Sequence, residues 1–149
     1  MPQFKDFPDH IAHTPVYVVP YFAHDPGKEN DTNVQFITVG WSQWDDDEPS
    51  AKVVRHSGQR WSRQSEELPL ARLVDLTILT ALALGSSSSF TTIDKGVFES
   101  QSLPIDVAHG SKRDRNALTE ELKSNKVLKR RFKELFRVLK EIDSSGGLG

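Results

Sequence analysis

The chain of 149 residues contains no cysteine. Disulfide bonds, thiolate zinc sites and cysteine nucleophiles are therefore excluded, and a reducing compartment is favoured. The opening residues, MPQFKDFPDH, lack the apolar core of a secretory signal. The longest apolar stretch, within residues 68–84, is interrupted by Arg72 and Asp75, so it does not predict a membrane span. These absences together predict a cytoplasmic protein.

Motifs that would identify a reaction are also missing. We find no nucleophile elbow, phosphate-binding loop or pair of catalytic carboxylates. The residue types of a hydrolytic triad occur near one another in the sequence, but no motif relates them: His56, Ser62 or Ser65, and Glu66 or Glu67. The sequence therefore favours a binding protein over an enzyme, with a small-molecule enzyme of no recognisable motif as the third interpretation.

The few histidines do not form a recognisable metal motif. His10, His13 and His24 lie near aspartates, but their spacing matches no strong ligand pattern. Such histidines are more typical of surface or turn positions. We therefore predict no metal site, and no motif indicates a cofactor.

Positive charge is scarce at the start of the chain and concentrated at its end. Residues 1–50 carry two basic and nine acidic side chains, a net charge of −7. Residues 51–111 carry six of each, and residues 112–149 carry eleven basic and six acidic side chains, a net charge of +5. The two ends can neutralise each other, or one end can bind a charged partner.

Alternation of apolar and polar residues predicts several strands. Residues 16–19 lie between two prolines and read as an edge strand. Residues 34–44 form a second strand, and residues 51–56 and 59–65 form a hairpin around Ser57–Gly58. Pairing around that two-residue turn places Val54 opposite Trp61. One face of the hairpin then carries Lys52, Val54, His56, Trp61 and Arg63.

Three helices are expected. Residues 68–84 are apolar nearly all round, which predicts a buried central helix. A short helix over residues 116–122 precedes a long C-terminal one. In the long helix, apolar residues recur at four-three spacing on one face: Leu128, Phe132, Leu135, Leu139 and Ile142. Basic residues recur on the opposite face.

The predicted fold class is α+β. We expect one domain over residues 1–143, with an antiparallel sheet of about four strands packed against the 68–84 helix and the C-terminal amphipathic helix. Residues 90–93 and 103–107 are short strands or ordered loop. Residues 144–149 are expected to be a disordered tail.

Cations and aromatic rings alternate on the hairpin and on the strand before it. The candidate ligand-binding residues are Lys52, Arg55, His56, Arg60, Trp61, Arg63 and Trp44. Single-stranded nucleic acid is bound by this combination, because cations contact phosphates and rings stack on bases. In the other interpretation, Trp61 packs in the core and the arginines pair with nearby carboxylates.

The stretch AKVVRHSGQRWSRQSEELPLARLVDLTIL resembles the signature of a small, mainly bacterial family of proteins of unknown function. In that family SAKVWRH is followed by KWSRQSEELPL and a leucine-rich helix. The likeness continues in ITVGWSQW before this stretch and, more weakly, in LFRVLKEID near the end of the chain. The resemblance implies membership of that family and brings no activity with it.

A looser, architectural similarity is to the coactivator p15-like single-stranded-DNA-binding folds, which usually dimerise. Strands that lead directly into a helix carry this likeness. It implies that a sheet bearing basic and aromatic side chains grips the nucleic-acid backbone, here through Lys52, Arg55, Arg60, Trp61 and Arg63. The acidic first third and residues 90–111 depart from that pattern, and a fold-level analogy specifies no function.

The leading functional prediction is a non-catalytic module that binds single-stranded nucleic acid or another phosphate-bearing ligand on the hairpin. The alternative is a protein–protein adaptor or self-associating regulatory protein. In that case the hairpin or the C-terminal helix binds an acidic protein partner or a second copy, as in a homodimer. Membrane binding is not expected, because the apolar face of the C-terminal helix is needed for the core.

Overall fold

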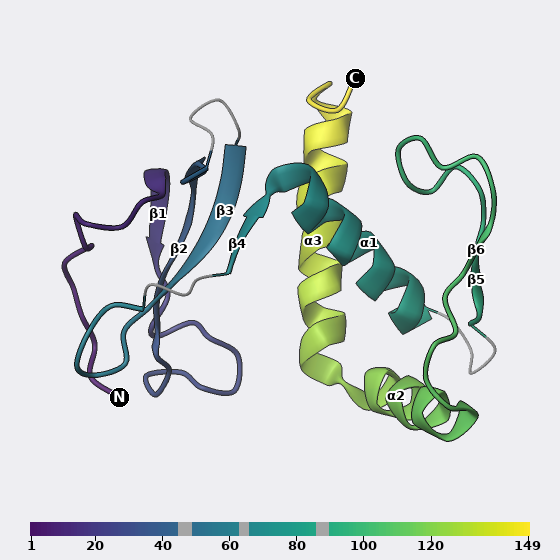
Figure 1. Cartoon of the computed structure of the whole chain (residues 1–149), viewed down its shortest axis with the longest axis horizontal. Helices are drawn as coiled ribbons and strands as arrows, with labels where there is room; N and C mark the ends of the chain where they lie inside the picture. Colours follow the sequence, from purple (N-terminus) through teal and green to yellow (C-terminus); the bar gives the residue numbers. More distant parts are fainter. Residues whose placement is uncertain (45–48, 63–65, 86–89) are drawn as a thin grey trace. The chain divides into compact units, whose positions relative to one another are not determined.

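The computed structural model describes residues 1–44, 49–62, 66–85 and 90–149. Within these residues an antiparallel four-stranded sheet, a two-stranded sheet and three helices confirm the α+β class (Figure 1). The chain divides into two compact units, Met1–Val74 and Asp75–Gly149. In the described part of the chain, no helix combines the length and apolar character that a membrane span requires.

The first unit is built on a sheet whose strands are neighbours in chain order. It consists of β1 (Thr14–Pro20), β2 (Val34–Trp41), β3 (Pro49–Arg55) and β4 (Glu67–Pro69). The edge position predicted for the first strand is confirmed. Proline cannot donate to a ladder, so Pro15 and Pro20 suit an edge strand.

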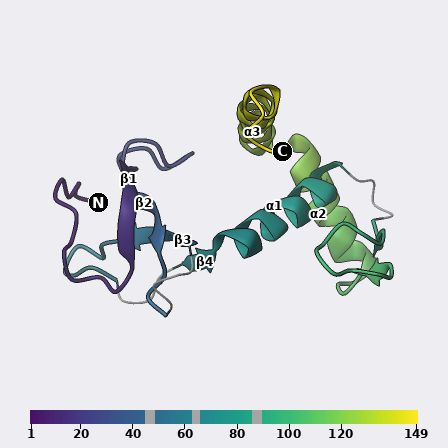
Figure 2. The same cartoon turned by 90° about the horizontal axis from the view of Figure 1, so that it is seen from above.

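Aromatic residues cover one face of this sheet, which we call the inner face. Phe36 and Val54 are buried there. The N-terminal segment runs beside the sheet (Figure 2) and brings Phe7 within 5.2 Å of Phe36, ring centre to ring centre. Phe4 lies 3.7 Å from the ring of His56. The core of the first unit therefore depends on residues 1–13 as well as on the strands.

The hairpin after β3 has a wider turn than predicted. His56 lies opposite Trp61, so the predicted pairing of Val54 with Trp61 is wrong. The Ser57 N–H donates to the Arg60 carbonyl at 2.9 Å, closing a four-residue loop. Because the pairing is displaced by two residues and side chains alternate with period two, the described residues of the predicted face (Lys52, Val54, His56 and Trp61) still share one face.

Two local features favour the wider loop. Ser57 Oγ accepts the backbone N–H groups of Gln59 and Arg60, at 3.3 and 3.2 Å. Gly58 has a φ of 97°, in the left-handed region where a side chain is disfavoured. A serine hydroxyl that caps backbone donors and a glycine with positive φ stabilise a turn that the strand pattern alone does not specify.

The second unit contains most of α1 (Leu70–Gly85), then β5 (Thr92–Ile93), β6 (Ile105–Asp106), α2 (Lys112–Ser124) and α3 (Lys126–Ser144). The two short strands pair antiparallel, in the segments where short strands were expected. Asn125 separates α2 from α3, and its side chain accepts the Leu128 N–H at 2.9 Å. This contact is an ordinary helix N-cap.

Helix α1 differs from its prediction in one respect. The helix is present, but none of its side chains is buried. Val74 and Leu76, for example, are each more than half exposed. An apolar composition indicates that a helix needs contacts, but it does not specify which surface supplies them.

Replacing Gly58 by alanine should destabilise the chain by about 1 kcal/mol, because a side chain at positive φ is strained. No other atom lies within 4 Å of the position a Cβ would take, so crowding contributes nothing. Urea denaturation measures the effect, with Gln59→Ala as the matched control in the same loop. Equal stability of the two variants would contradict the left-handed turn.

Candidate functional site

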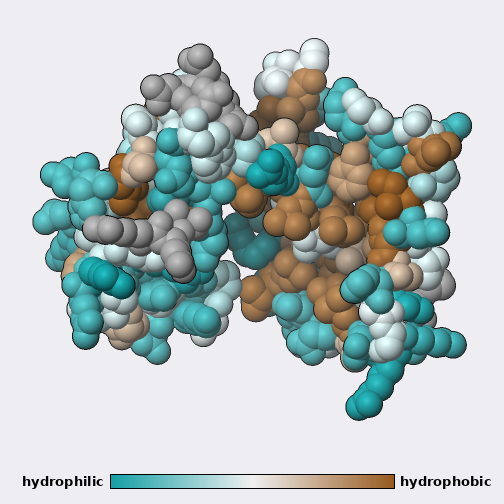
Figure 3. Space-filling view, viewed as in Figure 1, coloured by the Kyte–Doolittle hydropathy of each residue, from teal (hydrophilic) through white to brown (hydrophobic). Residues whose placement is uncertain are grey.

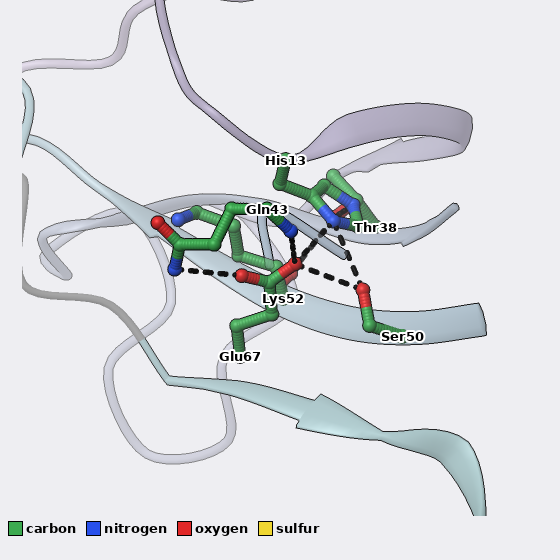
Figure 4. Close-up of polar contacts among 6 residues, drawn as sticks. All are labelled: His13, Thr38, Gln43, Ser50, Lys52 and Glu67. Atoms are coloured by element: carbon green, nitrogen blue, oxygen red, sulfur yellow. Dashed lines mark hydrogen bonds and ion pairs between the residues drawn. The ribbon is translucent and has the colours of Figure 1, made fainter. Parts of the chain in front are cut away.

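A cluster of polar side chains, all buried except that of Gln43, continues the inner face of the sheet (Figure 4). Thr38 on β2, Lys52 on β3 and Glu67 on β4 are successive cross-strand neighbours. His13 precedes β1, Gln43 follows β2, and Ser50 lies on β3. We call these six residues the polar network: His13, Thr38, Gln43, Ser50, Lys52 and Glu67.

The carboxylate of Glu67 is the centre of the polar network. Its Oε1 lies 2.8 Å from His13 Nδ1 and accepts the Ser50 hydroxyl at 2.9 Å. Gln43 donates its side-chain amide to Oε2 at 2.8 Å and its backbone N–H to Oε1 at 3.3 Å. A buried carboxylate is tolerated when its lone pairs are satisfied in this way.

His13 connects Glu67 to β2. Its Nε2 lies 3.0 Å from Thr38 Oγ1, and that hydroxyl donates to the Lys52 carbonyl at 3.1 Å. The two ring nitrogens of His13 therefore join the carboxylate on β4 to the hydroxyl on β2.

Burial and pairing act in opposite directions on Glu67. Burial alone would raise its pKa, but hydrogen bonds from Ser50 and His13 and the charge of His13 outweigh that effect. They hold the pKa below its ordinary value of 4.5. Burial also lowers the pKa of Lys52 from 10.5, and the nearby negative charge of Glu67 offsets part of this change.

The polar network is not arranged as a hydrolytic triad. Ser50 and Glu67 both contact the same ring nitrogen of His13, whereas a triad places nucleophile and acid on opposite nitrogens. Ser50 is also fully buried, at 0% exposure. Its hydroxyl is therefore out of reach of a substrate from solvent, and the network's evident role is to hold β4 against the sheet.

The predicted hairpin face is assembled, but it points inward. Lys52 and His56 are 5% and 7% exposed. The His56 ring stacks on Phe4 and meets the edge of Trp61, and its Nδ1 accepts the Gly58 N–H at 2.9 Å. Trp61 is half-buried. These residues form part of the core of the first unit.

The remaining predicted ligand-binding residues lie elsewhere. Arg55 is held by Glu66, with Nη2 2.8 Å from Oε1, and donates to Asn33 Oδ1 at 2.6 Å. Arg60 is exposed in the hairpin loop, and Trp44 is exposed just beyond β2. Arg63 lies outside the described residues.

The hydrolytic set proposed on paper is not brought together. Glu66 pairs with Arg55 and Glu67 with His13, while Ser65 lies outside the described residues. In the part of the chain that the structure describes, no three histidine, aspartate or glutamate side chains converge as metal ligands. His13, expected at a surface or turn, is instead 1% exposed.

The opposite face of the sheet, which we call the outer face, is apolar and open. Tyr17, Val39, Ala51 and Leu68 form one cross-strand row. Val19, Ile37 and Val53 form the next row. Together with Leu73 they line a groove of about 380 Å³. Tyr17 is 72% exposed at its rim.

Residues 5–144 match the model of a family of unknown function, DUF6530. The match spans most of the chain, so the chain belongs to this family, as the resemblance implied. In the same comparisons, neither a curated protein nor a solved structure matched the chain.

The geometry explains part of the sequence resemblance. Ser50 and Lys52 lie at the start of the SAKVVRH segment, and Glu67 lies within SEELPL. The polar network joins these two segments through one carboxylate. Sequence reasoning missed His13, Thr38 and Gln43, because nothing in their own neighbourhoods indicates a shared partner.

Replacing Glu67 by alanine should lower the free energy of unfolding by about 3 kcal/mol or more, because buried donors on His13 and Ser50 lose their acceptor. Urea denaturation measures the loss. Glu66→Ala is the matched control, since it removes a partly exposed ion pair worth less than about 1 kcal/mol. Equal effects of the two substitutions would contradict the network.

The lowered pKa of Glu67 also predicts an acid transition. Its stabilisation is complete above pH 4.5, the ordinary glutamate value, and is lost as the pH falls through the lower pKa of the folded state. In the Glu67→Ala variant this part of the pH dependence should disappear. The free energy of unfolding of both chains, measured by urea denaturation from pH 7 to acid, tests this prediction. The same pH dependence in both chains would contradict it.

Proposed function

We propose that the chain is a non-catalytic protein-interaction module that associates with a second copy of itself. The observation that carries this proposal is the amount of apolar side chain left open on both units. On the first unit it is the outer face, where Tyr17, Val19, Val39 and Trp41 are all exposed. Contiguous apolar patches on a folded protein are typical of interaction surfaces.

The second unit supports the same interpretation more strongly. Among its described residues, 75–85 and 90–149, Ile93 is the one large apolar residue that is buried. Broad apolar areas are visible over its helices (Figure 3). Amphipathic helices owe most of their stability to packing of the apolar face. Such a unit is expected to complete its core by association.

Charge complementarity favours a second copy as the partner. Residues 1–50 carry a net charge of −7 and residues 112–149 a net charge of +5. Each copy therefore presents both signs, and the acidic part of one attracts the basic part of the other. Such complementarity orients association and suppresses wrong pairings.

Binding of single-stranded nucleic acid or a phosphate-bearing ligand by the hairpin is the weaker alternative. Lys52 and His56 are buried, and Arg55 is engaged by Glu66 and Asn33. Arg60 is the exposed cation of the described hairpin residues. An acidic protein partner for the basic C-terminal part, and a cytoplasmic location, remain predictions.

Self-association predicts a concentration-dependent mass. Sedimentation velocity of the full chain between about 1 and 100 µM should show a shift from monomer to dimer. Raising the salt concentration should weaken the dimer if opposite charges attract across it. A strict monomer over this range would overturn the proposal.

The nucleic-acid alternative makes a separate prediction. If the hairpin bound a fluorescent single-stranded oligonucleotide, the affinity would fall steeply with salt, and Arg60→Ala would weaken it more than the control Arg131→Ala. Among the described hairpin residues Lys52 is buried and Arg55 is engaged by Glu66 and Asn33, which leaves Arg60 as a single exposed cation. One cation supplies too few phosphate contacts, so we expect no such difference in fluorescence anisotropy. A selective loss in the Arg60 variant would support the alternative over self-association.

A further inference from the structure

We propose that α3 is the seam of this self-association and that it forms an antiparallel two-stranded coiled coil with α3 of a second copy. This inference rests on the proposed function and names its contact surface. Helix α3 (Lys126–Ser144) is the longest in the described chain.

The apolar residues of α3 follow a heptad pattern. With Phe132 and Leu139 at the a positions, the d positions are Leu128, Leu135 and Ile142. This alternation of four and three residues is the pattern of a coiled-coil seam. Leu135, Leu139 and Ile142 are between 38% and 43% exposed, so the seam is open over its second half.

Two more apolar residues border the open half. Phe136 is 68% exposed and Val138 36%. They occupy the e and g positions, which flank the seam in a coiled coil and are often charged. Apolar residues there widen the stripe and increase the area that a partner helix would bury.

On the polar face of α3, charged side chains pair with one another within the helix. Arg137 Nη1 lies 2.7 Å from Glu141 Oε1, and Nη2 lies 2.5 Å from Glu134 Oε1. These pairs lie at the i, i+3 and i, i+4 spacings that neighbour each other on a helix surface. The polar face therefore stabilises the helix itself and leaves the apolar face for a partner.

Charge along the helix favours the antiparallel orientation. Residues 126–133 carry five basic and no acidic side chains, whereas residues 134–144 carry two basic and three acidic ones. A parallel pair would align the two strongly basic halves. An antiparallel pair sets the basic half of each helix against the acidic half of the other and also opposes the helix dipoles.

One register satisfies both the apolar and the charged residues. Leu135 lies opposite Leu139 of the second copy, and Phe132 lies opposite Ile142. In antiparallel coiled coils the e positions face each other, and Lys129 and Asp143 are both e positions. The pair then has two Lys129–Asp143 contacts between copies, one at each end of the seam. Lys129 already donates to the Lys123 carbonyl at the end of α2.

The first test introduces a charge into the seam of the full chain. Leu139→Lys should raise the dissociation constant of the dimer on the order of tenfold to a hundredfold. Arg130→Ala, at an f position on the polar face, is the matched control and should leave that constant unchanged. Circular dichroism of both variants establishes that they fold.

The second test exchanges two charges and distinguishes an antiparallel from a parallel pair of α3 helices. Lys129→Glu and Asp143→Lys should each weaken the dimer, because each places like charges together, and the double variant should restore it. A parallel coiled coil does not pair these positions, so it would show no restoration. Sedimentation equilibrium of the four chains gives the dissociation constants.

The outcomes separate the two proposals. A wild-type chain that dimerises as tightly as its Leu139→Lys variant would overturn the α3 seam and leave self-association intact, through another face. A wild-type chain that stays monomeric would overturn both. Weakening by Leu139→Lys without restoration in the double variant would overturn the antiparallel orientation.

Discussion

The carboxylate of Glu67 is the point on which the first unit depends. Strand β4 has three residues, too few to hold its place by ladder hydrogen bonds alone. One buried charge ties this short strand to His13 before β1, to Gln43 after β2 and to Ser50 on β3. Three segments, before β1, after β2 and on β3, therefore share a single acceptor on β4. A network of this kind is specific because any member that is displaced leaves a buried donor without a partner.

The outcome for the hairpin shows what pattern reasoning can establish. Alternation along β3 correctly placed Lys52, Val54 and His56 on one face, because side-chain direction follows from local geometry. Which face meets the core is not local. The inner face is determined by the rings of Phe4, Phe7 and Phe36, which cover one side of the sheet. The basic residues consequently became part of the interior, and the apolar rows led by Tyr17 became the open face.

The same limit applies to the helices. The existence of α1, α2 and α3 could be predicted from apolar periodicity and from breakers such as Gly85. The exposure of the α1 side chains could not be predicted. An apolar helix needs contacts, but its sequence does not specify which surface provides them. The site was least predictable of all. His13 looks like an ordinary turn histidine in sequence, and its role depends on a carboxylate 54 residues away.

The four-residue loop at Ser57–Arg60 has a consequence for how this family can vary. Adding or removing two residues there leaves Trp61 on the inner face, beside His56. Adding or removing one residue turns Trp61 to the opposite face, away from His56 and Phe4. Natural length variation in this loop is therefore expected in steps of two residues.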